Sequence, residues 1–190
     1  NNIYTIMGNH DYHKNPKSQI KNNFWNTPSF YYKLELDNKV DLFFIDTVQL
    51  FPGHCNISKA KIENVYNDCI YNINYNQLKW LNDELSKSKN KKIVFGHYPV
   101  ISNGVYKYKL QPIYDILFPI LKNNNVDAYV SGHEHNVQYL KRKIGDFNFN
   151  QFIIGSSAEN RINEYKYIFH RDMYDNKDNY IMIIHTKHDK

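Results

Sequence analysis

Apolar residues recur along this 190-residue chain in two patterns, short β-branched or aromatic runs and longer stripes at helical spacing. The runs predict strands, and the stripes predict helices that place one apolar face against a sheet. A helix over residues 76–88 carries Leu78, Leu81 and Leu85 on one face, and a second helix is expected over 111–125. Strands are expected at residues 2–7, 30–36, 40–46, 91–97 and 126–132.

The remaining segments complete a mixed α/β plan. A short helix is expected from Pro16, and the turn 37–39 joins two neighbouring strands. Gly145 marks the tip of a hairpin within residues 137–157, and a last strand is expected at 179–186. Helices that alternate with strands favour a mixed sheet with helical cover, and no repeat or linker divides the chain.

Three of the predicted strands end in the same way, with a glycine followed by polar side chains. Glycine lets the backbone turn sharply, and ligand sites form where the carboxyl ends of parallel strands meet. If these strands are parallel neighbours, their polar groups converge on one position. The three segments are Gly8-Asn9-His10-Asp11, Gly96-His97 and Gly132-His133-Glu134-His135.

The side chains of these segments are suited to a transition-metal site. Imidazole is the commonest metal ligand in proteins, and an asparagine carbonyl adds a neutral oxygen. In an extended segment, His133 and His135 would point to one face, with Glu134 turned away. A single Gly-His pair is usually only a turn, but three such strand ends favour metal binding. A mixed nitrogen and oxygen set favours iron, zinc or manganese over calcium or magnesium.

In chain order, GNHD (8–11), GHYPV (96–100) and SGHEHNVQYL (131–140) resemble the motifs of the calcineurin-like metallophosphoesterases. The flanking segments FWNTPSFYYKL, FFIDTV, QLKWL and LFPILKNNNVDAYVSGH are similar to those of small purple acid phosphatases of the tartrate-resistant type. The resemblance implies an α/β fold of the metallophosphoesterase type, a sandwich of mixed β-sheets flanked by helices. It also implies a single, partial domain over residues 1–190 that lacks the N-terminal strands.

The resemblance further implies a two-metal hydrolase of phosphate monoesters, with iron in one site and iron, zinc or manganese in the other. Asn9, His97 and His133 would bind one metal ion, and His135 would bind the second. The family takes its remaining ligands, two aspartates and a tyrosine, from two earlier strands. Residues 1–190 by themselves are therefore expected to show little or no activity.

The same resemblance assigns the catalytic side chains. His10 would contact the phosphate and help to protonate the leaving oxygen, and Asp11 would hold the His10 imidazole in orientation. The family usually places another histidine in the loop that follows GHYPV. Here that loop reads ISNGVYKYKL, so Tyr106 or Lys107 is expected in the place of the histidine.

Two other interpretations stay open at this point. The incomplete ligand set would suit a non-catalytic, phosphatase-like scaffold or binding protein. Against this, five residues with metal-binding or proton-transfer chemistry are intact, which favours an enzyme. Related folds cleave cyclic nucleotides or nucleic acids, but the flanking segments favour the monoesterases. The five residues are Asn9, His10, His97, His133 and His135.

Charge and composition narrow the expected partners and compartment. The net charge of +5 is mild, so we expect a phosphate ester and not a nucleic acid as ligand. No run reaches the length of a membrane span, and nothing indicates an oligomeric state. Cys55 and Cys69 are either separate thiols or a local disulfide, and Asn56 lies in an N-glycosylation pattern. These features favour a secretory glycoprotein, either secreted or in a lysosome- or vacuole-like compartment.

Overall fold

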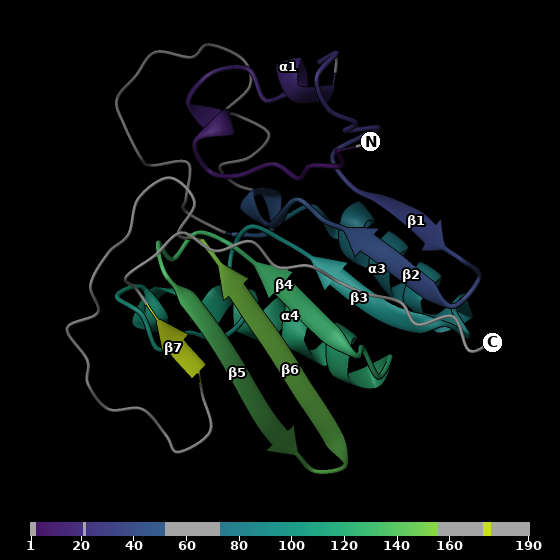
Figure 1. Ribbon diagram of the computed structural model, residues 1–190, viewed down its shortest axis with the longest axis vertical. Helices are drawn as coiled ribbons and strands as arrows, with labels where there is room; N and C mark the ends of the chain where they lie inside the picture. The colour runs from purple at the N-terminus through teal and green to yellow at the C-terminus, as the bar shows by residue number, and fades with distance from the viewer. Residues whose placement is uncertain (1–2, 21, 52–72, 156–172, 176–190) are drawn as a thin grey trace.

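The computed structural model of the chain describes residues 3–20, 22–51, 73–155 and 173–175. Within them, one mixed sheet has the strand order β1-β2-β3-β4-β6-β5-β7, and helices α3 and α4 cover one of its faces (Figure 1). The strands are β1 (Tyr32–Leu36), β2 (Val40–Phe44), β3 (Lys91–Phe95), β4 (Ala128–Ser131), β5 (Val137–Ile144), β6 (Phe147–Ile154) and β7 (Met173–Asp175).

The strands at the centre of the sheet are parallel, which is the condition for the polar groups at their carboxyl ends to converge. Strand β3 pairs in parallel with both β2 and β4, and β4 pairs in parallel with β6. Helix α4 (Gln111–Asn123) lies between β3 and β4 in the chain, which makes this pair a crossover unit. The outer strands β1, β5 and β7 run antiparallel to their neighbours.

The two predicted helices are present, and their apolar stripes form the main core. Helix α3 (Tyr75–Lys87) is capped by Asn74, whose side chain accepts a hydrogen bond from the Gln77 backbone at 3.0 Å. Each large apolar side chain in this core contributes about 1.5–3 kcal/mol relative to an exposed position. Fully buried members are Phe43, Leu81, Leu85, Val94, Ile113, Leu117, Leu121 and Tyr129.

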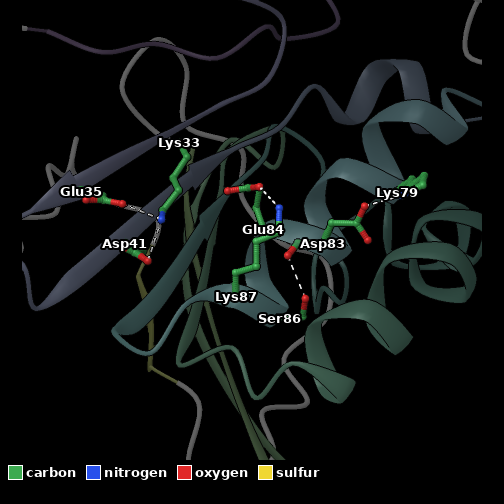
Figure 2. Close-up of polar contacts among 8 residues, drawn as sticks. All are labelled: Lys33, Glu35, Asp41, Lys79, Asp83, Glu84, Ser86 and Lys87. Carbon is green, nitrogen blue, oxygen red and sulfur yellow. Dashed lines mark hydrogen bonds and ion pairs between the residues drawn. The ribbon is translucent and has the colours of Figure 1, made fainter.

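The turn between β1 and β2 and the polar contacts beside it hold this edge of the sheet. Asp37 and Asn38 both have φ 54°, a left-handed conformation that these residue types tolerate better than others. Figure 2 shows Lys33 between two carboxylates, with its Nζ 2.9 Å from Glu35 and 3.1 Å from Asp41. The Asp41 side chain is buried, whereas that of Glu35 is exposed.

The remaining described elements are short. Helix α1 (Lys17–Ile20) confirms the short helix expected after Pro16. The predicted hairpin is also confirmed, with Gly145 at φ 64° between β5 and β6. The 3₁₀ turns are η1 (Asp11–His13), η2 (Thr47–Leu50) and η4 (Lys107–Lys109).

The prediction of a strand at residues 2–7 is wrong for the described part of that segment. Residues 3–7 pair only through one isolated parallel bridge, between Tyr4 and Asn26. A strand exists only where a neighbour continues the hydrogen-bonded ladder, and here the ladder stops after one bridge. Strand β7 was not predicted. The strand expected at 179–186 and the positions Cys55, Asn56 and Cys69 lie outside the described residues.

Candidate metal centre

The sheet places His97 and His133 side by side at the carboxyl ends of β3 and β4. The pairing continues past the strands, because Gly96 N donates to Val130 O at 3.0 Å and Gly132 N donates to His97 O at 3.1 Å. Two of the three polar strand ends are therefore parallel neighbours, as the sequence predicted. The third segment, around Asn9, approaches them as a loop and not as a strand.

Asn9, His97 and His133 form a cluster of converging donor atoms. Asn9 Oδ1 lies 2.6 Å from His97 Nε2, and His133 Nδ1 lies 3.2 Å from the same Nε2. All three residues are half-buried. Metal–ligand bonds of about 2.1 Å place neighbouring donors roughly 3 Å apart, and the two distances to His97 Nε2 are of this order. We call this group the Asn9–His97–His133 cluster.

Two backbone features allow the cluster to form. A Cβ on Gly8 would lie 3.1 Å from the His97 ring, so glycine permits the close approach of the Asn9 loop. His133 has φ 65°, in the left-handed region that non-glycine residues rarely adopt. The segment is therefore not extended at His133, and the strand alternation expected to align His133 with His135 does not apply.

The Glu134 side chain points toward the loop of residues 101–106. Glu134 is 1% exposed, and its Oε1 accepts hydrogen bonds from Ser102 Oγ at 2.7 Å and from Tyr106 N at 3.1 Å. Burial raises the pKa of Glu134, although these donors and the nearby His135 act in the opposite direction. His135 itself is half-buried, and its role as ligand of a second metal stays a prediction.

A site for two metals is not complete among the described residues. No three His, Cys, Asp or Glu side chains within them come close enough together to hold a metal ion. The Asn9–His97–His133 cluster meets the requirement of three donors only because Asn9 supplies an amide oxygen.

The predicted catalytic pair lies in the loop that carries Asn9. The His10 side chain is exposed, and its ring centroid is 4.8 Å from that of His13. The Asp11 carboxylate accepts from Gly8 N at 2.8 Å and from Gln19 Nε2 at 2.7 Å. These two bonds close the turn on itself, so Asp11 orders the loop that presents His10.

Aromatic rings surround His133. The rings of Tyr98 and Tyr106 lie 4.5 Å and 4.7 Å from the His133 ring, between centroids. Of the two residues expected after GHYPV, Tyr106 is thus the one placed at the cluster, while Lys107 Nζ lies 4.6 Å from the ring of Tyr108. Tyr98 was not anticipated, although it follows His97 directly.

A buried carboxylate that sequence reasoning missed anchors the Asn9 loop from behind. Asp46 is fully buried, and its carboxylate accepts hydrogen bonds from the Tyr12 hydroxyl and from the backbone of Val48. Gln49 Nε2 lies 2.9 Å from Tyr12 Oη and 3.1 Å from the Asp46 carboxylate. The sequence does contain a signal for Asp46. This aspartate ends the apolar run FFID directly before a turn, which is a typical helix-capping position.

The chain is similar in sequence to known proteins. The family model described as calcineurin-like phosphoesterase matches residues 1–137. Tartrate-resistant acid phosphatase type 5 of Sus scrofa is 32% identical over 152 residues, which cover 75% of this chain and 44% of that relative. Purple acid phosphatase 3 of Arabidopsis thaliana is 32% identical over 165 residues, which cover 82% of this chain and 44% of that relative.

Solved structures share the fold. The structure described as GAP50, the anchor in the inner membrane complex of Plasmodium, matches with a TM-score of 0.66 and 20% identity, over 93% of this chain and 57% of that chain. Purple acid phosphatase PPD1 from yellow lupin (Lupinus luteus) matches with a TM-score of 0.54 and 11% identity, over 80% of this chain and 28% of that chain. At these identities the likeness shows the fold alone.

The predicted fold class is thus confirmed, and the chain spans less than half the length of the curated relatives that it matches. Among the described residues, no helix is both long and apolar enough to cross a membrane. The family match covers most of the chain and includes the loop of Asn9 and the strand ends of His97 and His133. The chain belongs to the calcineurin-like phosphoesterase family.

Proposed function

We propose that the full-length protein hydrolyses phosphate monoesters as a metal-dependent acid phosphatase. The observation that carries the proposal is the convergence of Asn9 Oδ1 and His133 Nδ1 on His97 Nε2, each within hydrogen-bonding distance of it. The similarity to acid phosphatases at 32% identity supports the same reaction class.

In this proposal, Asn9, His97 and His133 hold one metal ion, and His135 contributes to a second. The metals are iron paired with iron, zinc or manganese, which suit a mixed nitrogen and oxygen donor set. When bound, two such cations neutralise charge on the phosphoryl group and make hydroxide available at mildly acidic pH.

His10 supplies the proton chemistry. Its exposed ring stands next to Asn9 in the chain, within a turn that Asp11 closes through Gly8 and Gln19. A protonated imidazole is a proton donor, so His10 can contact the phosphate and donate a proton to the leaving alkoxide. A loss of this proton transfer lowers the rate by about 10²–10⁴-fold.

The test uses full-length protein reconstituted with iron or zinc and assayed on p-nitrophenyl phosphate between about pH 5 and 7, the range where histidine titrates. We expect turnover, with much slower cleavage of the diester bis-p-nitrophenyl phosphate. The variant His10→Ala should lose most of the rate, whereas His13→Ala, one turn away and also exposed, should retain it. Absence of turnover in the reconstituted wild type would refute the proposal.

The second candidate is a non-catalytic scaffold of phosphatase fold. One observation favours it: the structure of GAP50, described as an anchor in a membrane complex, shares this fold at a TM-score of 0.66. The two candidates differ in their dependence on His10. A scaffold predicts metal-independent association with a partner and no effect of His10→Ala on it.

We also propose a secretory glycoprotein, located outside the cell or in a lysosome- or vacuole-like compartment. The support is the N-glycosylation pattern at Asn56 and the pair Cys55 and Cys69. Glycosidase treatment of protein from its native source should lower its mass, and Asn56→Gln should abolish that shift. An unchanged mass in both cases contradicts this location.

A further inference from the structure

We propose that Glu134 is a positioning residue that fixes the loop of residues 101–106 beside the Asn9–His97–His133 cluster. The proposal rests on the proposed phosphatase function, because it assigns Tyr106 a place at the edge of the substrate site. Glu134 acts through that loop and does not itself bind metal or substrate.

The carboxylate of Glu134 organises both ends of a short turn. Its Oε1 accepts from Ser102 Oγ at 2.7 Å and from Tyr106 N at 3.1 Å. Ser102 Oγ in turn accepts from Gly104 N at 2.7 Å, which closes the turn internally. One buried oxygen therefore joins the first and last residues of the segment 102–106. Hydrogen bonds to a charged or buried carboxylate are worth more than ordinary ones.

A second contact holds the same loop to the sheet. Asn103 N donates to Gln138 Oε1 at 2.9 Å, and Gln138 is fully buried on β5. The Gln138 amide nitrogen also lies 2.8 Å from Asn136 Oδ1, so its orientation is fixed. The loop thus rests on two polar side chains, Glu134 in the turn between β4 and β5 and Gln138 on β5.

Two glycines allow other segments to pack closely against Glu134. A Cβ on Gly104 would overlap all three atoms of the Glu134 carboxyl group. On the other side, a Cβ on Gly155 would overlap the Glu134 backbone carbonyl. Glu134 is therefore packed against the loop through its side chain and against Gly155 through its backbone.

The loop brings an aromatic ring and a cation to the cluster. The Tyr106 ring centroid is 4.7 Å from the His133 ring, and Lys109 Nζ lies 5.6 Å from the Tyr106 ring centroid. The organic group of a phosphate ester bound at the cluster would contact the Tyr106 ring. Removing the Glu134 carboxylate should therefore weaken substrate binding while the donors of His97 and His133 stay in place.

The first test compares Glu134→Ala with Glu134→Gln in the reconstituted full-length protein. The amide of glutamine keeps the Oε1 acceptor, so Glu134→Gln should restore most of the loss. For Glu134→Ala we expect KM for p-nitrophenyl phosphate to rise about tenfold, the equivalent of one strong hydrogen bond, with unchanged metal content and a smaller change in kcat. A merely structural defect would lower kcat through inactive protein and leave KM unchanged.

The second test does not depend on activity. Trypsin cleavage after Lys107 or Lys109 reports release of the loop, and the fragments are identified by mass. We expect about tenfold faster cleavage in Glu134→Ala, near wild-type rates in Glu134→Gln, and no change in Glu35→Ala, whose carboxylate is exposed on β1. If Glu134→Ala fails to fold, Ser102→Ala provides the alternative. It removes the bond from Ser102 to Glu134 and the bond from Gly104 N to Ser102, keeps the Glu134 carboxylate with its bond from Tyr106 N, and should still accelerate cleavage.

The two tests separate this proposal from the proposed function. Equal cleavage rates and equal KM values in wild type, Glu134→Ala and Ser102→Ala would overturn the role of Glu134. A wild type without phosphatase turnover would overturn the function, whereas accelerated cleavage in Glu134→Ala would still establish the contact between the turn and the loop.

Discussion

The Oδ1 atom of Asn9 lies 2.6 Å from the Nε2 atom of His97, although 88 positions separate the two residues in the chain. His133 joins them through its Nδ1 atom, 3.2 Å from the same nitrogen. Three segments that are remote in sequence therefore present their donor atoms at one point. This arrangement leads to the first prediction, on metal content.

Replacing His97 by alanine should lower the metal bound per molecule more than tenfold, because it removes the central donor of the cluster. The measurement is elemental analysis of purified full-length protein by mass spectrometry. His13→Ala is the matched control, since His13 is an exposed histidine that contacts the His10 ring and lies outside the cluster. Equal metal content in both variants would contradict the assignment.

The two carboxylates around Lys33 should differ strongly in their effect on stability. The Asp41 side chain is 2% exposed, and that of Glu35 is 62% exposed. Asp41→Asn should lower the free energy of unfolding by about 2 kcal/mol, because it breaks a buried pair. Glu35→Gln should cost less than about 0.5 kcal/mol, as for an exposed ion pair. Urea titration of both variants gives the comparison.

The same pair has a defined pH dependence. Burial alone would raise the pKa of Asp41, but the Ser88 hydroxyl, the Asn90 amide and the Lys33 ammonium outweigh burial and lower it. A group whose pKa is lowered by folding stabilises the native state above its unfolded pKa, and this contribution is lost as pH falls through the folded value. Acid unfolding should therefore begin at higher pH in Lys33→Met than in wild type.

Asp46 should give the opposite pH dependence. Burial raises the pKa of Asp46 to about 7, against hydrogen bonds from Tyr12, Gln49 and Val48 that lower it. Because the folded state then binds more protons than the unfolded one, the free energy of unfolding should fall as pH rises from 5 to 8, by on the order of 2 kcal/mol. Asp46→Asn, which cannot ionise, should flatten this slope in urea titrations. A slope equal to that of wild type would contradict the prediction.

Gly96 should not tolerate a side chain, because its Cα faces the Tyr129 ring. A Cβ there would overlap Tyr129 Oη and lie 2.7 Å from Thr47 Cγ2. Gly96→Ala should cost about 2 kcal/mol through overpacking. Tyr129→Phe should cost about 1 kcal/mol, since it removes the hydrogen bond to Tyr98 O.

The double variant Gly96→Ala/Tyr129→Phe provides the control for this mechanism. The phenylalanine removes the overlapping oxygen, so the combined loss should be smaller than the sum of the single losses. Thr47 Cγ2 remains in place, and the rescue should therefore be partial. Strictly additive losses in urea titration would show that the overlap with Tyr129 is not the cause.

Local sequence predicted those parts of the fold that local interactions determine. The stripes of α3 and α4, the hairpin at Gly145 and the strand ends at Gly96 and Gly132 follow from periodicity and turn chemistry. The strand expected at residues 2–7 failed because a strand depends on its pairing partner, and Tyr4 finds only one bridge. Periodicity carries no information on that partner.

The sequence predicted which residues meet in the candidate site, but not the conformations of their backbone and side chains. The motifs indicated Asn9, His97 and His133, which the structure brings together. The left-handed backbone of His133 and the direction of the Glu134 side chain depend on packing against residues 101–106 and Gly155. The bond between Tyr12 and Asp46 likewise joins positions 34 apart and follows from tertiary structure.

The parallel pairing of β3 with β4 also orders events in time. Parallel strands joined by a crossover form non-local contacts, which close late because the intervening chain must first lose entropy. Asn9 and His133 meet His97 only where β3 and β4 are paired, so the donor set exists only in chains with a completed central sheet. A metal ion that bound this set and not the unfolded chain would add its binding free energy to the stability of the native state.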